Sequence, residues 1–206
     1  MATVVLATGN AGKLAEFREA FEGSGVRFLS LKEIGFEGEI AEDGKTFRAN
    51  AEIKARAVAE FLERNPGRAA TVDAVLADDS GLEVAALGGA PGIHTARFAG
   101  PGATNSSNID KLLRCLEGAA DRRARFVCTL CLLRLGGEGR PEPEFFEGSC
   151  EGRILEARDG EGGFGYDPVF LPEGETRSFA RMTAAEKEPI SHRGRAVALL
   201  RRALAG

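Results

Sequence analysis

The feature that most constrains the fold is the stretch at positions 75–84. A strand-like apolar run leads into adjacent Asp78 and Asp79, and Ser-Gly then precedes a second short apolar run. Because adjacent aspartates are poor strand formers, we expect the buried strand to end at them. Two carboxylates there repel each other, and Mg²⁺ relieves that repulsion by taking one or two carboxylates together with substrate phosphates. The alternative is a polar turn in which Asp79 or Ser80 caps the following segment.

Length and charge limit the class of protein. A chain of 206 residues with 43% hydrophobic and 28% charged residues fits one globular domain over positions 1–206. The net charge of -4 argues against a nucleic-acid partner, which normally requires a basic surface. No apolar run approaches the roughly 20 residues of a membrane span. The N-terminus predicts a first strand and not a signal peptide, so we expect a cytoplasmic protein without a membrane partner.

The four cysteines do not predict a metal or redox centre. Cys128 and Cys131 form a C-x-x-C pair, but it lies inside an apolar run, and no second pair follows. Residues three apart in a strand point to opposite faces. We therefore interpret the pair as buried, reduced thiols.

A glycine-rich turn near the N-terminus is a candidate phosphate site. The strand Thr3–Ala7 is followed by Thr8-Gly-Asn-Ala-Gly-Lys13 and then by a helix to about Phe21. Backbone N–H groups at a helix N-terminus bind phosphate. Lys13 in the first turn opposes the helix dipole unless a polyanion is bound there. The turn lacks the Walker A spacing, and a plain strand–turn–helix connection remains the alternative.

An acidic loop and a strong helix follow. The loop at positions 35–45 carries Glu42, and such a loop is otherwise ordinary solvated surface. The apolar stripe of the next segment predicts a helix from Thr46 to about Glu63. On it, Asn50 and Lys54 are one turn apart and can face one target, although they are also compatible with a solvent-facing pair.

The remaining pattern predicts an α/β fold. A packed Gly/Pro-rich loop covers 87–102, a helix is expected from Asn105 to about Leu116, and a buried strand from Arg125 to Leu135. Another strand or strand pair, interrupted by glycines, is expected from Phe145 to about Arg158. Since strands and helices mix without strict alternation, we expect a mixed twisted sheet with flanking helices.

Two further segments are candidates for contact with a nucleobase. In the cluster at 162–168, glycines allow close backbone approach and Phe164 can stack on a base; a hairpin turn with aromatic core anchors is the alternative. Ser191 is a suitable N-cap for a C-terminal helix, which would put His192 and Arg193 in its first turn. The alternative there is a helix start whose charges face solvent.

Taken together, these segments resemble the inosine/xanthosine triphosphate pyrophosphatases. The matches follow the family's order and cover nearly the whole chain; they are Thr8–Lys13, Thr46 and Phe47 with Asn50, Ala51 and Lys54, Ala77–Leu82, Gly88–Ile93, Gly162–Pro168, and Glu186 and Lys187 with Ser191–Gly194. The sequence departs from the family in having His94 at a tyrosine position. It also has Ala41 where some members carry a second acid, which makes Glu42 the expected metal ligand of that loop.

The resemblance implies an elongated, two-lobed protomer with a central cleft, a homodimer, and Mg²⁺-dependent hydrolysis of a purine nucleoside triphosphate to monophosphate and pyrophosphate. It implies that Asp79 activates water and holds Mg²⁺ with Glu42, with Asp78 nearby as a further candidate ligand. The substrate-binding residues it implies are Thr8, Gly9, Asn10, Ala11, Gly12, Lys13, Lys54, Ser80, Phe164, Gly165, Tyr166, Asp167, Lys187, His192 and Arg193. We expect Lys13 and Lys54 to serve the phosphates and to be dispensable for stability.

Two other classes remain as alternatives. The Maf-like nucleotide pyrophosphatases share the house-cleaning role and act on other bases. A nucleotide-binding regulatory module without turnover is disfavoured, because a mere binder gains nothing from three acids beside a triphosphate.

Overall fold

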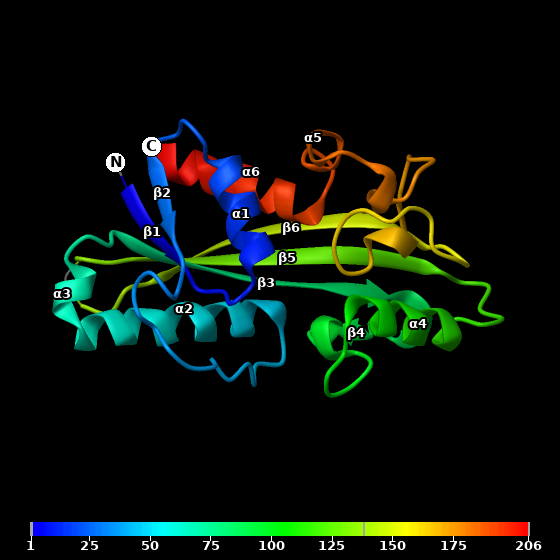
Figure 1. Ribbon diagram of the computed structural model, residues 1–206, viewed down its shortest axis with the longest axis horizontal. Helices are drawn as coiled ribbons and strands as arrows, with labels where there is room; N and C mark the ends of the chain where they lie inside the picture. The colour runs from blue at the N-terminus through cyan, green and yellow to red at the C-terminus, as the bar shows by residue number, and fades with distance from the viewer. Residues whose placement is uncertain (1, 138, 206) are drawn as a thin grey trace. The chain divides into compact units, whose positions relative to one another are not determined.

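The structure is a computed structural model that describes residues 2–137 and 139–205, and it is an α/β fold (Figure 1). The strands are β1 (Ala2–Leu6), β2 (Val26–Leu29), β3 (Ala74–Val84), β4 (Pro91–Gly92), β5 (Arg123–Arg134), β6 (Pro143–Ile154) and β7 (Phe170–Pro172). The helices are α1 (Ala11–Ala20), α2 (Phe47–Arg64), α3 (Pro66–Ala69), α4 (Asn105–Cys115), α5 (Ala184–Lys187) and α6 (His192–Ala205). Four 3₁₀ turns complete this part of the chain: η1 (Ala85–Leu87), η2 (Thr95–Arg97), η3 (Asp167–Val169) and η4 (Phe179–Arg181).

The strands form one mixed sheet, as predicted. Its order is β2-β1-β3-β5-β6-β7, and β4 pairs with β3 off this path. Strand β1 runs parallel to both β2 and β3, whereas the β3–β4 and β6–β7 pairs are antiparallel. Among the helices of the described residues, none is long and apolar enough to cross a membrane.

The chain divides into two compact units. Unit 1 consists of Met1–Asp79, Thr129–Phe146 and Leu199–Gly206, and unit 2 of Ser80–Cys128 and Glu147–Ala198. The expected single domain with a central cleft stays a prediction.

Unit 1 is built around the N-terminal strands. The apolar stripe of α2, including Ala51, Ala55 and Val58, packs against one face of the sheet. The same face carries Val5 and Val75, which confirms the predicted helix and its buried side. Helix α1 lies on the other side of β3 from α2 (Figure 1). Each side of β3 therefore has a helix next to it, α1 on one side and α2 on the other (Figure 1).

Strand β3 corrects the sequence prediction at its most informative point. The strand continues through Asp78 and Asp79 to Val84, so the two acids lie within an 11-residue strand and neither end it nor form a turn. Asp residues are unfavourable in strands because their short polar side chains favour turn conformations. Here that preference is overcome by an ion pair for each carboxylate, which the sequence pattern of β3 alone does not reveal.

Unit 2 has its own apolar core. Leu82 and Val84 of β3 pack with Ile109 and Leu112 of α4 and with Phe126 of β5. The expected helix from Asn105 is confirmed as α4.

Strand β6 is continuous over Pro143–Ile154 despite its glycines. A Cβ on Gly148 would lie 2.1 Å from the backbone oxygen of His192 and 2.7 Å from the Ala196 nitrogen. Glycine at this position therefore lets the first turns of α6 lie directly on the strand. Gly148 thus makes room for the helix that carries His192 and does not interrupt the strand.

Candidate active site

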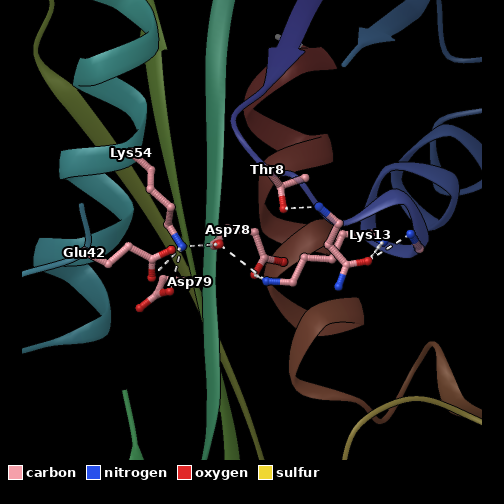
Figure 2. A network of polar contacts seen from close by, with 8 residues as sticks. Thr8, Lys13, Glu42, Lys54, Asp78 and Asp79 are labelled. Atoms are coloured by element: carbon pink, nitrogen blue, oxygen red, sulfur yellow. Dashed lines mark hydrogen bonds and ion pairs between the residues drawn. The ribbon is translucent and has the colours of Figure 1, made fainter. Parts of the chain in front are cut away.

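The side chain of Asp78 points to the α1 side of β3. Its Oδ1 accepts a hydrogen bond from Lys13 Nζ at 2.5 Å, and the Asp78 side chain is fully buried whereas that of Lys13 is 15% exposed (Figure 2). Residue 13 is at the start of α1, 65 positions away in the sequence. The ion pair therefore fixes the predicted phosphate-binding lysine over β3.

The turn before α1 caps its own helix. Asn10 Oδ1 accepts hydrogen bonds from the backbone N–H groups of Gly12 at 2.9 Å and Lys13 at 3.2 Å. The Asn10 N–H donates to Thr8 Oγ1 at 3.2 Å. Gly9 is exposed, and a Cβ there would meet nothing within 4 Å. The prediction of a strand, a glycine turn and a helix is confirmed, but Asn10 already occupies two of the N–H groups expected to face phosphate.

On the α2 side of β3, three charged side chains converge. Lys54 Nζ donates to Asp79 Oδ1 at 2.7 Å and to the backbone oxygen of Asp78 at 2.9 Å. Glu42 Oε2 lies 3.5 Å from the same Nζ (Figure 2). Lys54 is only 7% exposed, so this ammonium is held by two carboxylates in a largely dehydrated setting.

The second oxygen of Asp79 is the most unusual atom of this cluster. Asp79 is 7% exposed, and its Oδ2 is buried without a hydrogen-bond partner among residues 2–137 and 139–205. Burial raises the pKa of the Asp79 carboxyl above its ordinary value, an effect that the neighbouring Lys54 ammonium opposes. An unpaired carboxylate oxygen with a raised pKa is suited to accept a proton or bind a cation.

The two adjacent acids therefore do different things. Because neighbouring strand residues point to opposite faces, Asp78 pairs with Lys13 while Asp79 faces Lys54 and Glu42 (Figure 2). In the described part of the chain, His, Cys, Asp and Glu do not gather in groups of three or more that could hold a metal ion. Glu42 with Asp79 nevertheless suits Mg²⁺, which takes few carboxylates and completes its coordination with water and phosphate.

The structure gives a reason to revise the expectation that Lys13 and Lys54 are dispensable for stability. It rested on the helix dipole, which disfavours a lysine in a first turn. The structure pairs each lysine with a largely buried carboxylate, Asp78 or Asp79. Removing either ammonium leaves a buried charge short of its counter-ion, and that penalty exceeds the dipole effect.

The remaining predicted residues belong to unit 2, where Asp167 organises the glycine cluster. Asp167 Oδ2 accepts a hydrogen bond from Lys187 Nζ at 2.6 Å and from the Phe164 N–H at 2.7 Å. A Cβ on Gly163 would lie 2.3 Å from this oxygen, and its φ of +79° also favours glycine. Phe164 is 51% exposed, so the turn presents an aromatic residue to solvent. Gly165 follows with a φ of +62°.

Tyr166 is a core residue. It is buried in the apolar core of unit 2, and its hydroxyl donates to the backbone oxygen of Thr95 at 2.9 Å. Burial also raises the pKa of the Tyr166 phenol. The structure thus gives Tyr166 a packing role and leaves Phe164 as the accessible aromatic residue of the cluster, a combination of the two interpretations drawn from the sequence.

The start of α6 positions His192 and Arg193, as predicted. Ser191 Oγ accepts a hydrogen bond from the Gly194 N–H at 3.0 Å, as an N-capping residue does. His192 is buried, and its ring stacks on Phe126 with centroids 4.7 Å apart and an interplanar angle of 12°. Arg193 and Ser80 are both half-buried.

Comparisons with known proteins identify the family of this chain. The model of the Ham1 family matches residues 4–203. The chain belongs to the Ham1 family. A dITP/XTP pyrophosphatase from Syntrophobacter fumaroxidans is 48% identical over 203 residues, which cover 98% of this chain and 81% of that protein. One of the same name from Bacillus anthracis is 44% identical, over 96% of this chain and 93% of that protein.

Solved Ham1 structures have the same fold. The HAM1 protein from Coxiella burnetii superimposes with a TM-score of 0.86 at 39% identity, covering 99% of this chain and 98% of that chain. The family membership inferred from the motifs is thereby confirmed.

Sequence reasoning missed or undervalued several residues of this Ham1 chain. Phe126, which stacks on His192, lies in an ordinary apolar run and gave no signal. Thr95 accepts hydrogen bonds from the Tyr166 hydroxyl and the Leu82 N–H, and its sequence context did not indicate either contact. Asn50 was noted beside Lys54 but not counted among the site residues, although its complete burial on α2 is unusual for an amide.

Proposed function

We propose that this chain hydrolyses deaminated purine nucleoside triphosphates (ITP, dITP and XTP) to the monophosphate and pyrophosphate, with Mg²⁺ as cofactor. The observation that carries the proposal is the pair of ammonium–carboxylate contacts on the two faces of β3. Lys13 with Asp78 supplies a cation beside a glycine turn, and Lys54, Asp79 and Glu42 supply acids beside a second cation. Binding of a triphosphate requires positive charge, which Lys13 and Lys54 supply, and its hydrolysis requires a base, for which Asp79 is the candidate.

The phosphate chain is held by the Lys13 side. Thr8, Gly9, Asn10, Ala11 and Gly12 form the turn at the N-terminus of α1, where the helix dipole favours an anion. Gly9 lets a phosphate approach the backbone because no side chain would stand there. Asn10 caps the helix in the absence of substrate. A phosphate oxygen can replace its carboxamide oxygen as the acceptor, which would free the carboxamide to contact the substrate.

The cation is held by the Lys54 side. Glu42 and Asp79 would hold Mg²⁺, and Asp78, which faces Lys13, would orient that lysine and not coordinate the metal. Bound Mg²⁺ would neutralise phosphate charge and template the displacement. Lys54 keeps the two carboxylates together until substrate binds.

The reaction is a displacement at the α-phosphorus. The oxygen of a water molecule bonds to this phosphorus while its proton passes to Asp79. The bond from the α-phosphorus to its bridging oxygen breaks, and pyrophosphate leaves. Asp79 Oδ2, buried and unpaired among the described residues, is the oxygen suited to receive the proton. General-base assistance of this kind contributes typically about 10²–10⁴-fold in rate.

Base selection is assigned to the unit 2 residues. Deamination replaces the 6-amino donor of adenine with a 6-oxo acceptor, so a pocket rich in donors should favour inosine and xanthosine. His192 and Arg193 supply such donors at the start of α6, and Phe164 supplies an exposed ring for stacking. Lys187, held by Asp167, extends the donor set together with the Gly165 backbone, while Ser80 contacts the substrate. Tyr166 supports this set from the core.

The proposal includes a homodimer in the cytoplasm, where free nucleotides are found. Its test is an assay of the purified protein with ITP, dITP, XTP, ATP, GTP, CTP and UTP, with and without Mg²⁺, in which pyrophosphate and phosphate are measured separately. We expect pyrophosphate and the monophosphate from the deaminated nucleotides, and only with Mg²⁺. Release of single phosphates, or equal turnover of ATP and ITP, would overturn the assignment. Turnover of pyrimidine triphosphates alone would favour the Maf-like alternative. Analytical ultracentrifugation tests the dimer.

A further inference from the structure

Asn50 on α2 is a buried amide without a hydrogen bond. Its exposed fraction is 0%, and neither Oδ1 nor Nδ2 has a partner among the residues that the structure describes. Buried side-chain amides are nearly always paired, so an exception requires a reason. The helix backbone of Asn50 is normally bonded, since its N–H donates to the Thr46 oxygen at 3.0 Å. The anomaly is therefore confined to the side chain.

A second asparagine in the chain occupies the same position on another helix. Both α2 and α4 begin after a threonine N-cap, Thr46 and Thr104, whose hydroxyl accepts the N–H three residues later. In each helix an asparagine follows four residues after the cap, Asn50 in α2 and Asn108 in α4. Both asparagines are buried. The two helix starts thus form a matched pair within one chain.

Asn108 shows what an asparagine at this position does. Its Nδ2 donates to the backbone oxygen of Ala96 at 3.0 Å, and its Oδ1 accepts from the Ala99 N–H at 2.7 Å. Both partners belong to the segment that precedes α4. The carboxamide of Asn108 therefore ties the incoming chain to the first turn of its helix.

The segment that precedes α2 passes over Asn50 without making such bonds. A Cβ on Gly44 would lie 2.6 Å from Asn50 Oδ1, so the Gly44 backbone already lies against the carboxamide. Glu42 is two residues earlier in the same irregular segment, and its carboxylate lies 3.5 Å from Lys54 Nζ, against 2.7 Å for Asp79. The loop is thus close to Asn50, but its backbone makes no hydrogen bond to the Asn50 carboxamide, and the Glu42–Lys54 ion pair is long.

We propose that Asn50 is a positioning residue for Glu42. When a divalent cation draws the Glu42 carboxylate inward, the backbone at positions 41–45 moves over the Asn50 carboxamide and forms the bonds that Asn108 makes at α4. Asn50 then stabilises the loaded form of the loop and contributes nothing to the cation-free form. This inference rests on the proposed assignment of Glu42 as a metal ligand.

The test compares Asn50→Leu with Asn108→Leu as its matched control. Thermal unfolding is measured without metal. Mn²⁺ affinity is measured by electron paramagnetic resonance, with Mn²⁺ alone and with the non-hydrolysable α,β-methylene analogue of ITP. Hydrogen exchange of the backbone at positions 38–45 is followed with and without Mn²⁺. Gly44→Ala perturbs the same contact from the loop, because its new Cβ would lie 2.6 Å from Asn50 Oδ1, 2.9 Å from Ala49 Cβ and 3.0 Å from the Asn50 nitrogen. It carries the test if Asn50→Leu does not fold.

For Asn50→Leu we expect a metal-free melting temperature equal to or above that of the unsubstituted protein and a loss of Mn²⁺ affinity of about 10-fold or more, the range for groups that orient metal ligands. Mn²⁺ should protect the loop from exchange in the unsubstituted protein and not in this variant. Asn108→Leu should melt lower and keep its Mn²⁺ affinity. If Asn50→Leu instead melts lower and binds Mn²⁺ as before, the inference is wrong while the proposed function stands. If the unsubstituted protein binds Mn²⁺ neither alone nor with the ITP analogue, the inference and the proposed function both fail.

Discussion

Removal of the Lys54 ammonium is the perturbation whose result the structure predicts most sharply. The side chain is 9% exposed, and its Nζ holds Asp79 Oδ1 at 2.7 Å. Lys54→Met keeps the length and apolar stem of the side chain and removes only its charge and donors. The variant therefore isolates the ion pair from the packing of α2.

The magnitude follows from the burial of both partners. Removing one partner of a buried ion pair destabilises a protein by about 3–5 kcal/mol, since the remaining charge is dehydrated and uncompensated. For a chain of this size 1 kcal/mol corresponds to roughly 2–4 °C in melting temperature, so we expect a fall of about 6–20 °C. An exposed pair such as Arg64–Glu60, whose side chains are 76% and 51% exposed, should contribute less than about 1 kcal/mol.

The assay is thermal and urea unfolding of Lys54→Met, Asp79→Asn and the double variant, with Arg64→Met as the surface control. Because Asp79→Asn removes the charge that Lys54→Met leaves uncompensated, the double variant should be more stable than Lys54→Met alone. A melting shift for Lys54→Met no larger than that of Arg64→Met would refute the reasoning. Additive destabilisation in the double variant would refute it as well, because the two residues would then not be coupled.

Four further predictions concern chemistry, specificity and surface groups. Asp79→Asn should lower kcat for ITP at least about 10²-fold at saturating Mg²⁺, because it removes the proton acceptor; turnover near the original value would exclude that role. Arg193→Ala should narrow the preference for ITP over ATP, measured as the ratio of their kcat/KM values; one missing contact is worth about 10- to 100-fold, and a constant ratio would show that base selection lies elsewhere. Hydrogen bonds from the Thr183 backbone and Arg177 hold the pKa of the Glu186 carboxyl at about 2, below its ordinary 4.5. The stabilisation by the ionised Glu186 carboxylate should therefore be complete above pH 4.5 and disappear as the pH falls toward about 2. The difference in melting temperature between the unsubstituted protein and Glu186→Gln should shrink over this pH range, and a pH-independent difference would contradict the prediction. Iodoacetamide should modify exposed Cys115 in the native protein and reach the other three cysteines only after unfolding, as counted by mass spectrometry.

The sequence was sufficient for the fold class and for the helices with strong apolar stripes. Helix α2 could be predicted because Ala51, Ala55 and Val58 recur at helical spacing, and this periodicity depends only on local sequence. The start of α6 could be predicted from Ser191 for the same reason, since capping is a local interaction. Elements that depend on such local patterns could therefore be predicted from the sequence.

Contacts between distant segments could not be predicted in this way. Strand β3 was expected to end at Asp78 because the stabilising partners of the two acids, Lys13 and Lys54, lie 65 and 25 residues away. Phe126 gave no sign of stacking on His192, because an aromatic residue in an apolar run has the same pattern whatever it contacts. The sequence also did not show that β6 is continuous, because the glycine at position 148 is required by the backbone of α6, which lies on the strand there.

The alternation of side chains along β3 connects these observations to the proposed mechanism. If the two acids formed a turn, both carboxylates could face one cation. In a strand they face opposite sides, so Asp78 is committed to Lys13 and only Asp79 remains beside Glu42. In the proposed mechanism, this separation gives Asp78 the role of orienting the phosphate-binding lysine and gives Asp79 the roles at the cation and the attacking water. It also gives a reason for two aspartates in a strand despite their poor propensity: exchanging either for a better strand former would leave Lys13 or Lys54 without its carboxylate partner.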